Sequence, residues 1–71
     1  MKYRLIDGYR HDRYFVGFNL RSGGFRYTTD IEKAVTFFSK RDAFSYMKEF
    51  ELLGDFDVVN ENGKIFTGYK V

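Results

Sequence analysis

The chain of 71 residues contains no cysteine, no proline and no tryptophan, and it has a single histidine. Without cysteine it can form no disulfide and offers no thiolate to a metal, which favours a reducing compartment. One histidine falls short of the roughly four ligands that a structural zinc site needs. No apolar run approaches the roughly 20 residues of a membrane-spanning helix, and the N-terminal MKYRLIDGYR lacks the apolar core of a secretory signal. We therefore expect one cytoplasmic, soluble domain that does not contact a membrane.

The sequence also lacks the patterns of a catalytic centre. His11 stands in a polar stretch, where a solvated loop histidine is favoured over a proton-transfer cluster with Asp7 and Asp12. The segment DFDVVNENG (55–63) begins like a calcium-binding loop, but Val59 stands where that loop needs an acidic ligand. We expect a protein that is not an enzyme and that uses no cofactor and no metal.

Charge is nearly balanced but unevenly distributed. The chain carries 12 Lys and Arg against 10 Asp and Glu, a net charge of +2. Residues 1–30 carry six basic and three acidic groups, and five of the six are arginines. Because arginine binds carboxylates and phosphates in a bidentate manner, this half indicates either an acidic partner or an ordinary solvated sheet face.

Three strands are predicted in the N-terminal part of the chain. KYRLI (2–6) and RYFVGFNL (13–20) alternate with a period of two, and FRYTT (25–29) follows the turn signal SGG (22–24). A tight turn there pairs Leu20 with either Phe25 or Tyr27. In both registers the same faces of the two strands lie on the same side of the sheet.

The alternation in the second strand assigns its side chains to two faces. The residues predicted to face the core are Tyr14, Val16, Phe18 and Leu20. Phe15 falls on the opposite face together with Arg13.

A helix is predicted over SKRDAFSYMKEFELLG (39–54). Ser39 is a candidate N-cap, and Gly54 stands where a left-handed residue would end the helix. At about 100° per residue one stripe faces the core, and it comprises Ala43, Tyr46, Met47, Phe50 and Leu53. Leu52 falls on the polar side. Upstream, Thr29 and Glu32 match the capping arrangement of a short helical turn.

The C-terminal segment 55–71 is typical of a hairpin. With Asn62-Gly63 as a two-residue type I′ turn, Val59 pairs with Phe66 and both point away from the helix. The residues that then face the helix are Phe56, Val58, Ile65 and Tyr69.

The predicted element order is βββαββ. The simplest arrangement is an α+β fold in which one twisted antiparallel sheet of about five strands carries one helix on one face. Such a fold has more apolar side chains than a single helix can cover. One of Phe37 and Phe38 is expected inside, and the residues left on the open sheet face are Ile6, Phe15, Val59 and Phe66.

These open-face residues suggest a partner surface. If they are contiguous, they form a patch of a few hundred Å², which is typical of an interaction site. If they are scattered, arginine and lysine stems cover the rings. Aromatic residues beside arginine are typical of interfaces. The candidate partner-binding residues are Arg4, Arg13, Phe15, Arg26, Val59 and Phe66.

The pattern A-x-x-F-x-S-x-x-D-A runs from Ala34 to Ala43, between an antiparallel meander and a closing hairpin. With this order of meander, pattern and hairpin, the chain resembles small orphan accessory proteins of bacteriophages and mobile elements. The resemblance covers about half of its length. The resemblance implies a host-directed role, in which the protein binds and blocks a host enzyme or defence complex inside the host cell. It transfers no functional residue.

Three hypotheses remain open at this point. The leading one is a non-enzymatic module that docks a host protein through the open sheet face. The second is a small nucleic-acid-binding protein that uses the arginine and aromatic residues of the same face, although RYFVGFNL does not match the RNA-recognition signature. The third, against which the absence of a catalytic pattern argues, is an enzyme centred on His11 and Asp12. Self-association into a homodimer through an exposed face or strand edge is a further possibility.

Overall fold

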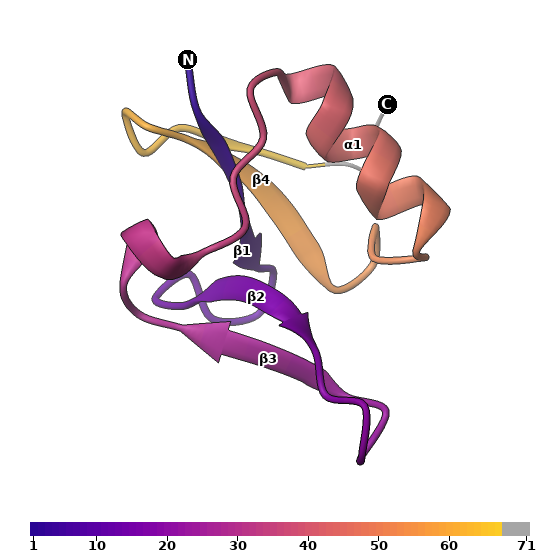
Figure 1. The fold of residues 1–71 in the computed structure, drawn as a ribbon. Coiled ribbons are helices and arrows are strands. Elements are labelled where there is room, and N and C mark those ends of the chain that lie inside the picture. Colours follow the sequence, from indigo (N-terminus) through magenta and orange to yellow (C-terminus); the bar gives the residue numbers. More distant parts are fainter. Residues whose placement is uncertain (68–71) are drawn as a thin grey trace.

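The computed structural model describes residues 1–67, which form an α+β fold. Their five antiparallel strands build one sheet in the order β3-β2-β1-β4-β5 (Figure 1). The strands are β1 (Tyr3–Asp7), β2 (Tyr14–Phe18), β3 (Phe25–Thr28), β4 (Phe56–Asn60) and β5 (Ile65–Phe66). A 3-10 helix, η1 (Ile31–Lys33), precedes the α-helix α1 (Lys40–Glu49). The predicted fold class and element order are confirmed.

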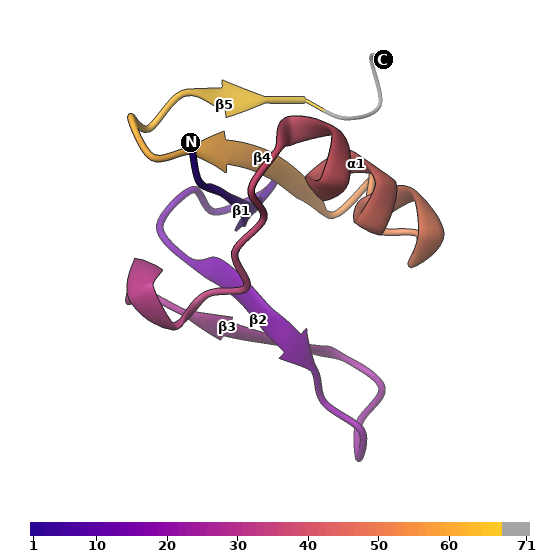
Figure 2. The ribbon, with the colours of Figure 1, turned by 45° about the horizontal axis from the view of Figure 1, so that its top comes forward.

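Helix α1 covers only part of the sheet. It packs on β1 and β4, whereas the β2–β3 hairpin extends away from it (Figure 1, Figure 2). The segment between η1 and α1 connects the two parts of the sheet. Phe37 and Tyr3 exchange two backbone hydrogen bonds of 2.8 Å, and the Val35 N–H donates to the Phe15 carbonyl at 3.2 Å.

The core lies between α1 and the sheet and is held together by aromatic rings. Its buried members are Leu5, Phe15, Ala43, Met47, Leu52, Phe56 and Val58. The Phe56 ring meets the rings of Phe15 and Phe25 edge to face, with both centroid distances 5.1 Å. Each such contact contributes about 0.5–1.5 kcal/mol beyond area burial, which helps a small domain without disulfides.

A β-bulge in β2 reverses the predicted position of Phe15. The register between β2 and β3 shifts between Phe15 and Gly17, so that Val16 is an extra residue on β2. The shift moves the alternation by one position and brings Phe15 and Phe18 to the same face. The prediction that Phe15 points away from the core is therefore wrong, because its side chain is fully buried.

The β2–β3 turn also differs from the prediction. Phe18 pairs with Phe25, and the Asn19 N–H donates to the Gly24 carbonyl at 2.8 Å. Leu20 therefore lies in the turn, where it is 96% exposed, and pairs with neither predicted partner. Two further residues that were predicted to face the core are half-buried and lie outside the core cluster, namely Tyr14 and Val16.

The C-terminal hairpin is one residue out of its predicted register. Val58 pairs with Phe66 and Val59 pairs with Ile65, so residues 61–63 form a three-residue loop. Phe66 consequently packs against the core, contrary to the prediction, and Ile65 is exposed on the other face. The predicted core position of Tyr69 lies outside the described residues.

The loop of this hairpin is organised by Asn60. Its Oδ1 accepts the backbone N–H groups of Asn62 and Lys64, each at 2.9 Å. Gly63 has a φ of 85°, the left-handed conformation that closes three-residue hairpin loops. The extra side-chain acceptor therefore favours three loop residues over the two that Asn62-Gly63 alone predicts.

Helix α1 starts as predicted but ends earlier. The Ser39 hydroxyl accepts the Asp42 N–H at 3.0 Å, which confirms the N-cap. At the other end Glu51, not Gly54, takes the left-handed conformation, with a φ of 58°. The Leu52 N–H then donates to the Met47 carbonyl at 2.7 Å, which is the Schellman arrangement. This turn carries Leu52 into the core, contrary to the prediction.

Residues 30–38 contain one wrong and one confirmed prediction. The N-cap of η1 is Asp30 and not Thr29 as predicted. The Asp30 carboxylate accepts the Glu32 N–H at 3.0 Å. Of the two adjacent phenylalanines, Phe37 packs against the core and Phe38 is exposed, as expected for a pair of which one lies inside.

Candidate interaction surfaces

The structure separates the six residues that were predicted to contact a partner. Phe15 belongs to the core, and Val59 is buried on the opposite face of the sheet. Val59 is enclosed because β4 is an interior strand, flanked by β1 and β5. Both predicted contacts are therefore wrong. Arg26 is exposed on β3 and remains available to a partner.

Arg4 is enclosed rather than presented to solvent. It is 5% exposed and pairs with Val59 across β1 and β4. Its Nε is buried and has no hydrogen-bond partner within residues 1–67. The predicted exposed contact is wrong, and the burial of Arg4 beside Val59 supports the alternative in which arginine stems cover the apolar residues of this face.

Phe66 is half-buried and its ring already has two cations beside it. The Lys40 Nζ lies 4.6 Å and the Lys64 Nζ 5.3 Å from the ring centroid. Cations at this distance are attracted to the ring face. Because the ring packs on the core and meets these two lysines, the prediction that Phe66 faces away from the helix toward a partner is wrong.

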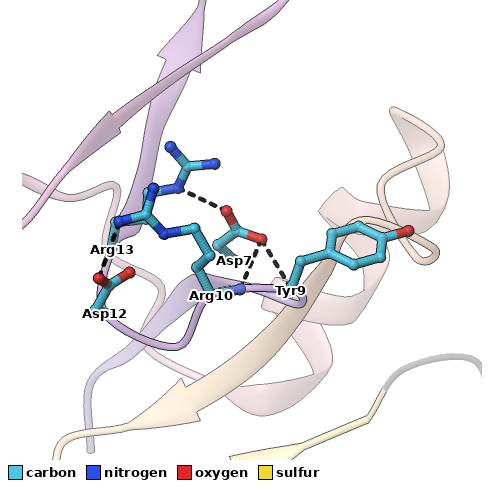
Figure 3. A network of polar contacts seen from close by, with 5 residues as sticks. All are labelled: Asp7, Tyr9, Arg10, Asp12 and Arg13. Carbon is cyan, nitrogen blue, oxygen red and sulfur yellow. Dashed lines mark hydrogen bonds and ion pairs between the residues drawn. The ribbon is translucent and has the colours of Figure 1, made fainter.

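Arg13 anchors the loop between β1 and β2. Its Nε donates to Asp7 Oδ2 at 2.6 Å, and the other carboxylate oxygen accepts the N–H groups of Tyr9 and Arg10 at 2.8 and 3.3 Å (Figure 3). The Arg13 guanidinium carbon also lies 3.7 Å from the centroid of the Tyr27 ring. Arg13 is thus half-buried and held in place by a carboxylate and a ring.

The same contacts set the charge state of Asp7. Burial raises the pKa of this carboxyl group, but the N–H groups of Tyr9 and Arg10 and the guanidinium of Arg13 outweigh that effect. The net result is a pKa below the ordinary value of 3.8. Asp7 therefore remains ionised at neutral pH although its side chain is buried.

The only histidine holds the same loop to the sheet. His11 Nε2 lies 3.3 Å from Asp57 Oδ2 on β4, and the imidazole is about half exposed. Within residues 1–67, no three potential ligands gather in a way that could hold a metal ion. In that same part of the chain, no helix has the length and apolar character needed to cross a bilayer.

A chain of six partly exposed aromatic rings runs from β3 across β2 to helix α1. We call it the aromatic row, and in spatial order it comprises Tyr27, Phe25, Phe18, Phe50, Tyr46 and Phe37. Successive ring centroids are 6.5, 6.1, 5.7, 4.6 and 5.3 Å apart. None of the six side chains is fully buried, and Phe50 is 46% exposed.

Buried rings of the core contact the aromatic row. Phe15 contacts Phe18 at 5.4 Å and Tyr46 at 6.2 Å, and Phe56 contacts Phe25 at 5.1 Å. The rings are partly exposed because α1 packs mainly on β1 and β4, and because the helix ends at Glu49 and so leaves Phe50 uncovered. The short helix and the projecting hairpin together create this surface.

Both tyrosines of the aromatic row remain protonated at neutral pH. Burial raises the pKa of Tyr46 above 10.0, and the nearby Glu49 carboxylate raises it further. Burial also raises the pKa of Tyr27, where the charges of Asp7 and Asp55 add to the rise and Arg13 opposes it. The row is thus uncharged, with carboxylates near both ends.

The prediction of surplus aromatic surface placed it on the wrong face of the sheet. Five of the six rings of the row were expected in the core, and for Phe37 and Phe38 the assignment was left open. Four of the five pack against the core as predicted, namely Phe18, Phe25, Tyr27 and Tyr46, whereas Phe50 is 46% exposed. One signal in the sequence could have located the change. Gly17 interrupts the apolar alternation of RYFVGFNL, and an isolated glycine inside a strand pattern is typical of a β-bulge.

Comparison with protein-family models, with curated proteins and with solved structures gave no match to this chain. A functional assignment consequently depends on the surfaces described above.

Proposed function

We propose that the protein is a non-enzymatic module that docks another protein through the aromatic row. The observation that carries the proposal is a contiguous chain of six aromatic rings that remains partly exposed. Contiguous apolar surface is typical of interaction sites, and aromatic residues are enriched at the centres of interfaces.

The mutual contacts of the rings also favour binding. Each ring of the row touches at least one neighbour, and the buried Phe15 and Phe56 hold several of them from below. Side chains that are already ordered lose little conformational entropy when a partner binds. The aromatic row is therefore a pre-organised surface.

Blocking a host enzyme or a defence complex is the role that the resemblance in the sequence implies. Such a role requires a docking surface and no catalytic group, so the aromatic row suffices for it. We extend the proposal to this role, with a host protein as the partner.

Nucleic acid has weaker support as the ligand of this surface. Glu49 lies near Tyr46 and Asp55 near Tyr27, so a phosphate backbone on the row would meet like charge. Of the arginines in the nucleic-acid hypothesis, Arg4 is enclosed and Arg13 is engaged by Asp7. We expect no gel shift with single- or double-stranded probes at low salt, and a shift that weakens steeply with salt would favour the alternative.

A matched pair of phenylalanine variants tests the docking surface. Phe50 belongs to the row, whereas Phe38 is 74% exposed and forms no ring pair with the described residues. Peptides are first selected from a random-sequence display library on the unaltered protein. We expect them to bind Phe38→Ala as before and to lose about tenfold or more in affinity on Phe50→Ala, as for the loss of an interface anchor.

Circular dichroism melts of both variants establish that the fold is retained. If the selected peptides bind Phe50→Ala as tightly as the unaltered protein, the row is not the docking surface. Light scattering of the purified protein at several concentrations tests whether the chain associates with itself. A homodimer that dissociates on Phe50→Ala would identify a second copy of the chain as the occupant.

A further inference from the structure

Helix α1 segregates its charges by face. Asp42 and Glu49 lie four residues before and three residues after Tyr46, so all three share the side of the helix that bears the aromatic row. At 100° per residue the basic residues of the helix fall on its other sides, and these are Lys40, Arg41 and Lys48. The helix therefore presents carboxylates beside the row and ammonium or guanidinium groups away from it.

The end of the helix adds a further carboxylate. Glu51 is exposed and follows Phe50 directly, with a φ of 58°. Glycine is the usual residue in this conformation, so an acidic residue directly follows Phe50 in the chain at a conformational cost. The C-terminal end of a helix also carries partial negative charge. Two acidic residues, Glu49 and Glu51, thus flank Phe50 in the chain at the C-terminal end of the helix.

The chain itself contains an example of the contact that this arrangement favours. At the β3 end of the row, the Arg13 guanidinium lies over the Tyr27 ring and donates to the Asp7 carboxylate. A cation is held there by a ring face and a carboxylate at the same time. At the helix end, the rings of Tyr46 and Phe50 lie 4.6 Å apart, Glu49 is near Tyr46, and Glu51 follows Phe50 in the chain. Within residues 1–67 no lysine or arginine lies over either ring.

We propose that the protein segment docking on the aromatic row presents an arginine or lysine side chain to Tyr46 and Phe50, between the carboxylates of Glu49 and Glu51. This inference rests on the proposed function and names the chemistry of its partner. A guanidinium or ammonium group gains from the ring faces and from the two carboxylates together. The apolar remainder of the partner segment covers the rings of the row that belong to the β2–β3 hairpin, namely Phe18, Phe25 and Tyr27.

Small amino-acid derivatives test the cation preference without a known partner. N-acetyl-arginine N-methylamide is titrated into ¹⁵N-labelled protein, with the glutamine and glutamate derivatives as neutral and anionic probes. We expect the arginine probe to shift the amide signals around Tyr46 and Phe50 and to bind about threefold or more tighter than the glutamine probe, as for an exposed cation–π contact. The glutamate probe should leave these signals unmoved.

Charge-removing variants assign the effect to the named carboxylates. In the double variant Glu49→Gln, Glu51→Gln, affinity for the arginine probe should fall about threefold, while affinity for the glutamine probe stays constant. Glu32→Gln is the matched control, because Glu32 is an exposed glutamate on η1, outside α1. It should leave both affinities unchanged. Amide spectra of each variant show whether the fold is intact.

The outcomes separate this inference from the proposed function. This inference alone fails if two results occur together. The peptides selected from the display library require Phe50 but contain no excess of arginine or lysine, and the arginine and glutamine probes bind alike. The partner is then not cationic, although it still docks on the row. If peptide binding is indifferent to Phe50→Ala, the proposed function fails as well. A single-stranded oligonucleotide that shifts the signals of Tyr46 and Phe50 would overturn the inference in favour of a phosphate ligand.

Discussion

Phe15 and Phe18 meet edge to face on the same side of β2, with their ring centroids 5.4 Å apart. In an unbroken strand, residues three positions apart point to opposite faces. The bulge between Phe15 and Gly17 removes that constraint. As a result one ring lies at the centre of the core while the other belongs to the aromatic row, and their contact is one of several that join the core to the candidate surface.

Replacing Phe15 with alanine should destabilise the protein severely. Removing a buried phenylalanine ring costs about 3–5 kcal/mol, and a domain of this length has a total stability of roughly 4–10 kcal/mol at the usual free energy per residue. Urea unfolding followed by circular dichroism measures the loss. Leu20→Ala, in the exposed turn, is the control and should change the free energy of unfolding by less than about 0.5 kcal/mol. A Phe15→Ala variant as stable as that control would place Phe15 outside the core.

The loop of the β4–β5 hairpin gives a second test. In the observed loop the Asn60 side chain accepts two backbone N–H groups, whereas the Asn62 side chain accepts none from residues 1–67. Asn60→Ala should therefore cost about 1–3 kcal/mol and Asn62→Ala much less. A two-residue type I′ turn would reverse the order, because Asn62 would then need a positive φ. Thermal unfolding of the two variants under the same conditions distinguishes the registers.

Glu51→Gly should stabilise the protein. A non-glycine residue in the left-handed region costs about 1–2 kcal/mol, and the added backbone freedom of glycine in the unfolded chain offsets part of that gain. We expect the free energy of unfolding to rise by about 0.5–1 kcal/mol, with Glu49→Gly, inside the helix, as a destabilising counterpart. A melting temperature that falls in Glu51→Gly would contradict the strained helix end.

These variants mark where reasoning from the sequence succeeded and where it stopped. The number, order and type of elements follow from apolar periodicity and from the Ser39 cap, which act within a few residues. The assignment of Phe15 and Phe66 to faces failed because one inserted or omitted residue inverts every side chain beyond it. Such a shift is decided by distant contacts, such as the Val35 hydrogen bond to Phe15, or by a side-chain acceptor such as Asn60.

The candidate surface was missed for the same reason. Counting apolar residues against the area of one helix predicted a surplus on the open sheet face, but Phe15 and Val59 are buried and Phe66 packs on the core, whereas the exposure of Phe50 depends on where α1 ends. That end is set by Glu51 in a conformation that favours glycine, whereas the sequence offers Gly54 as the more probable stop. Because the left-handed residue is Glu51, three residues before Gly54, Phe50 lies on the exposed surface and not in the predicted core.

Removing the charge of Arg4 should not weaken the fold. Its buried Nε has no partner within residues 1–67, and an unpaired buried donor costs about 1–3 kcal/mol. Arg4→Met retains most of the apolar stem without the guanidinium, so the free energy of unfolding should stay constant or rise by about 1 kcal/mol. Arg13→Met is the contrasting variant, which loses an ion pair and should be destabilised. Equal destabilisation of both variants would show that Arg4 makes a stabilising polar contact.

The ion pair between Asp7 and Arg13 should make stability depend on pH in the acid range. The pKa of Asp7 is below 3.8 in the folded protein and returns to the ordinary value on unfolding, so the unfolded chain binds the proton more readily. The stabilisation is therefore complete above the unfolded pKa and is lost as the pH falls through the lower, folded pKa.

Asp7→Asn should cost about 1–3 kcal/mol at neutral pH, a value reduced by the partial exposure of Arg13. Urea unfolding of both proteins, repeated from neutral pH down to about pH 3, should show the gap between them narrowing only below about pH 4. A gap that stays constant through this range would mean that the carboxylate charge of Asp7 does not stabilise the fold.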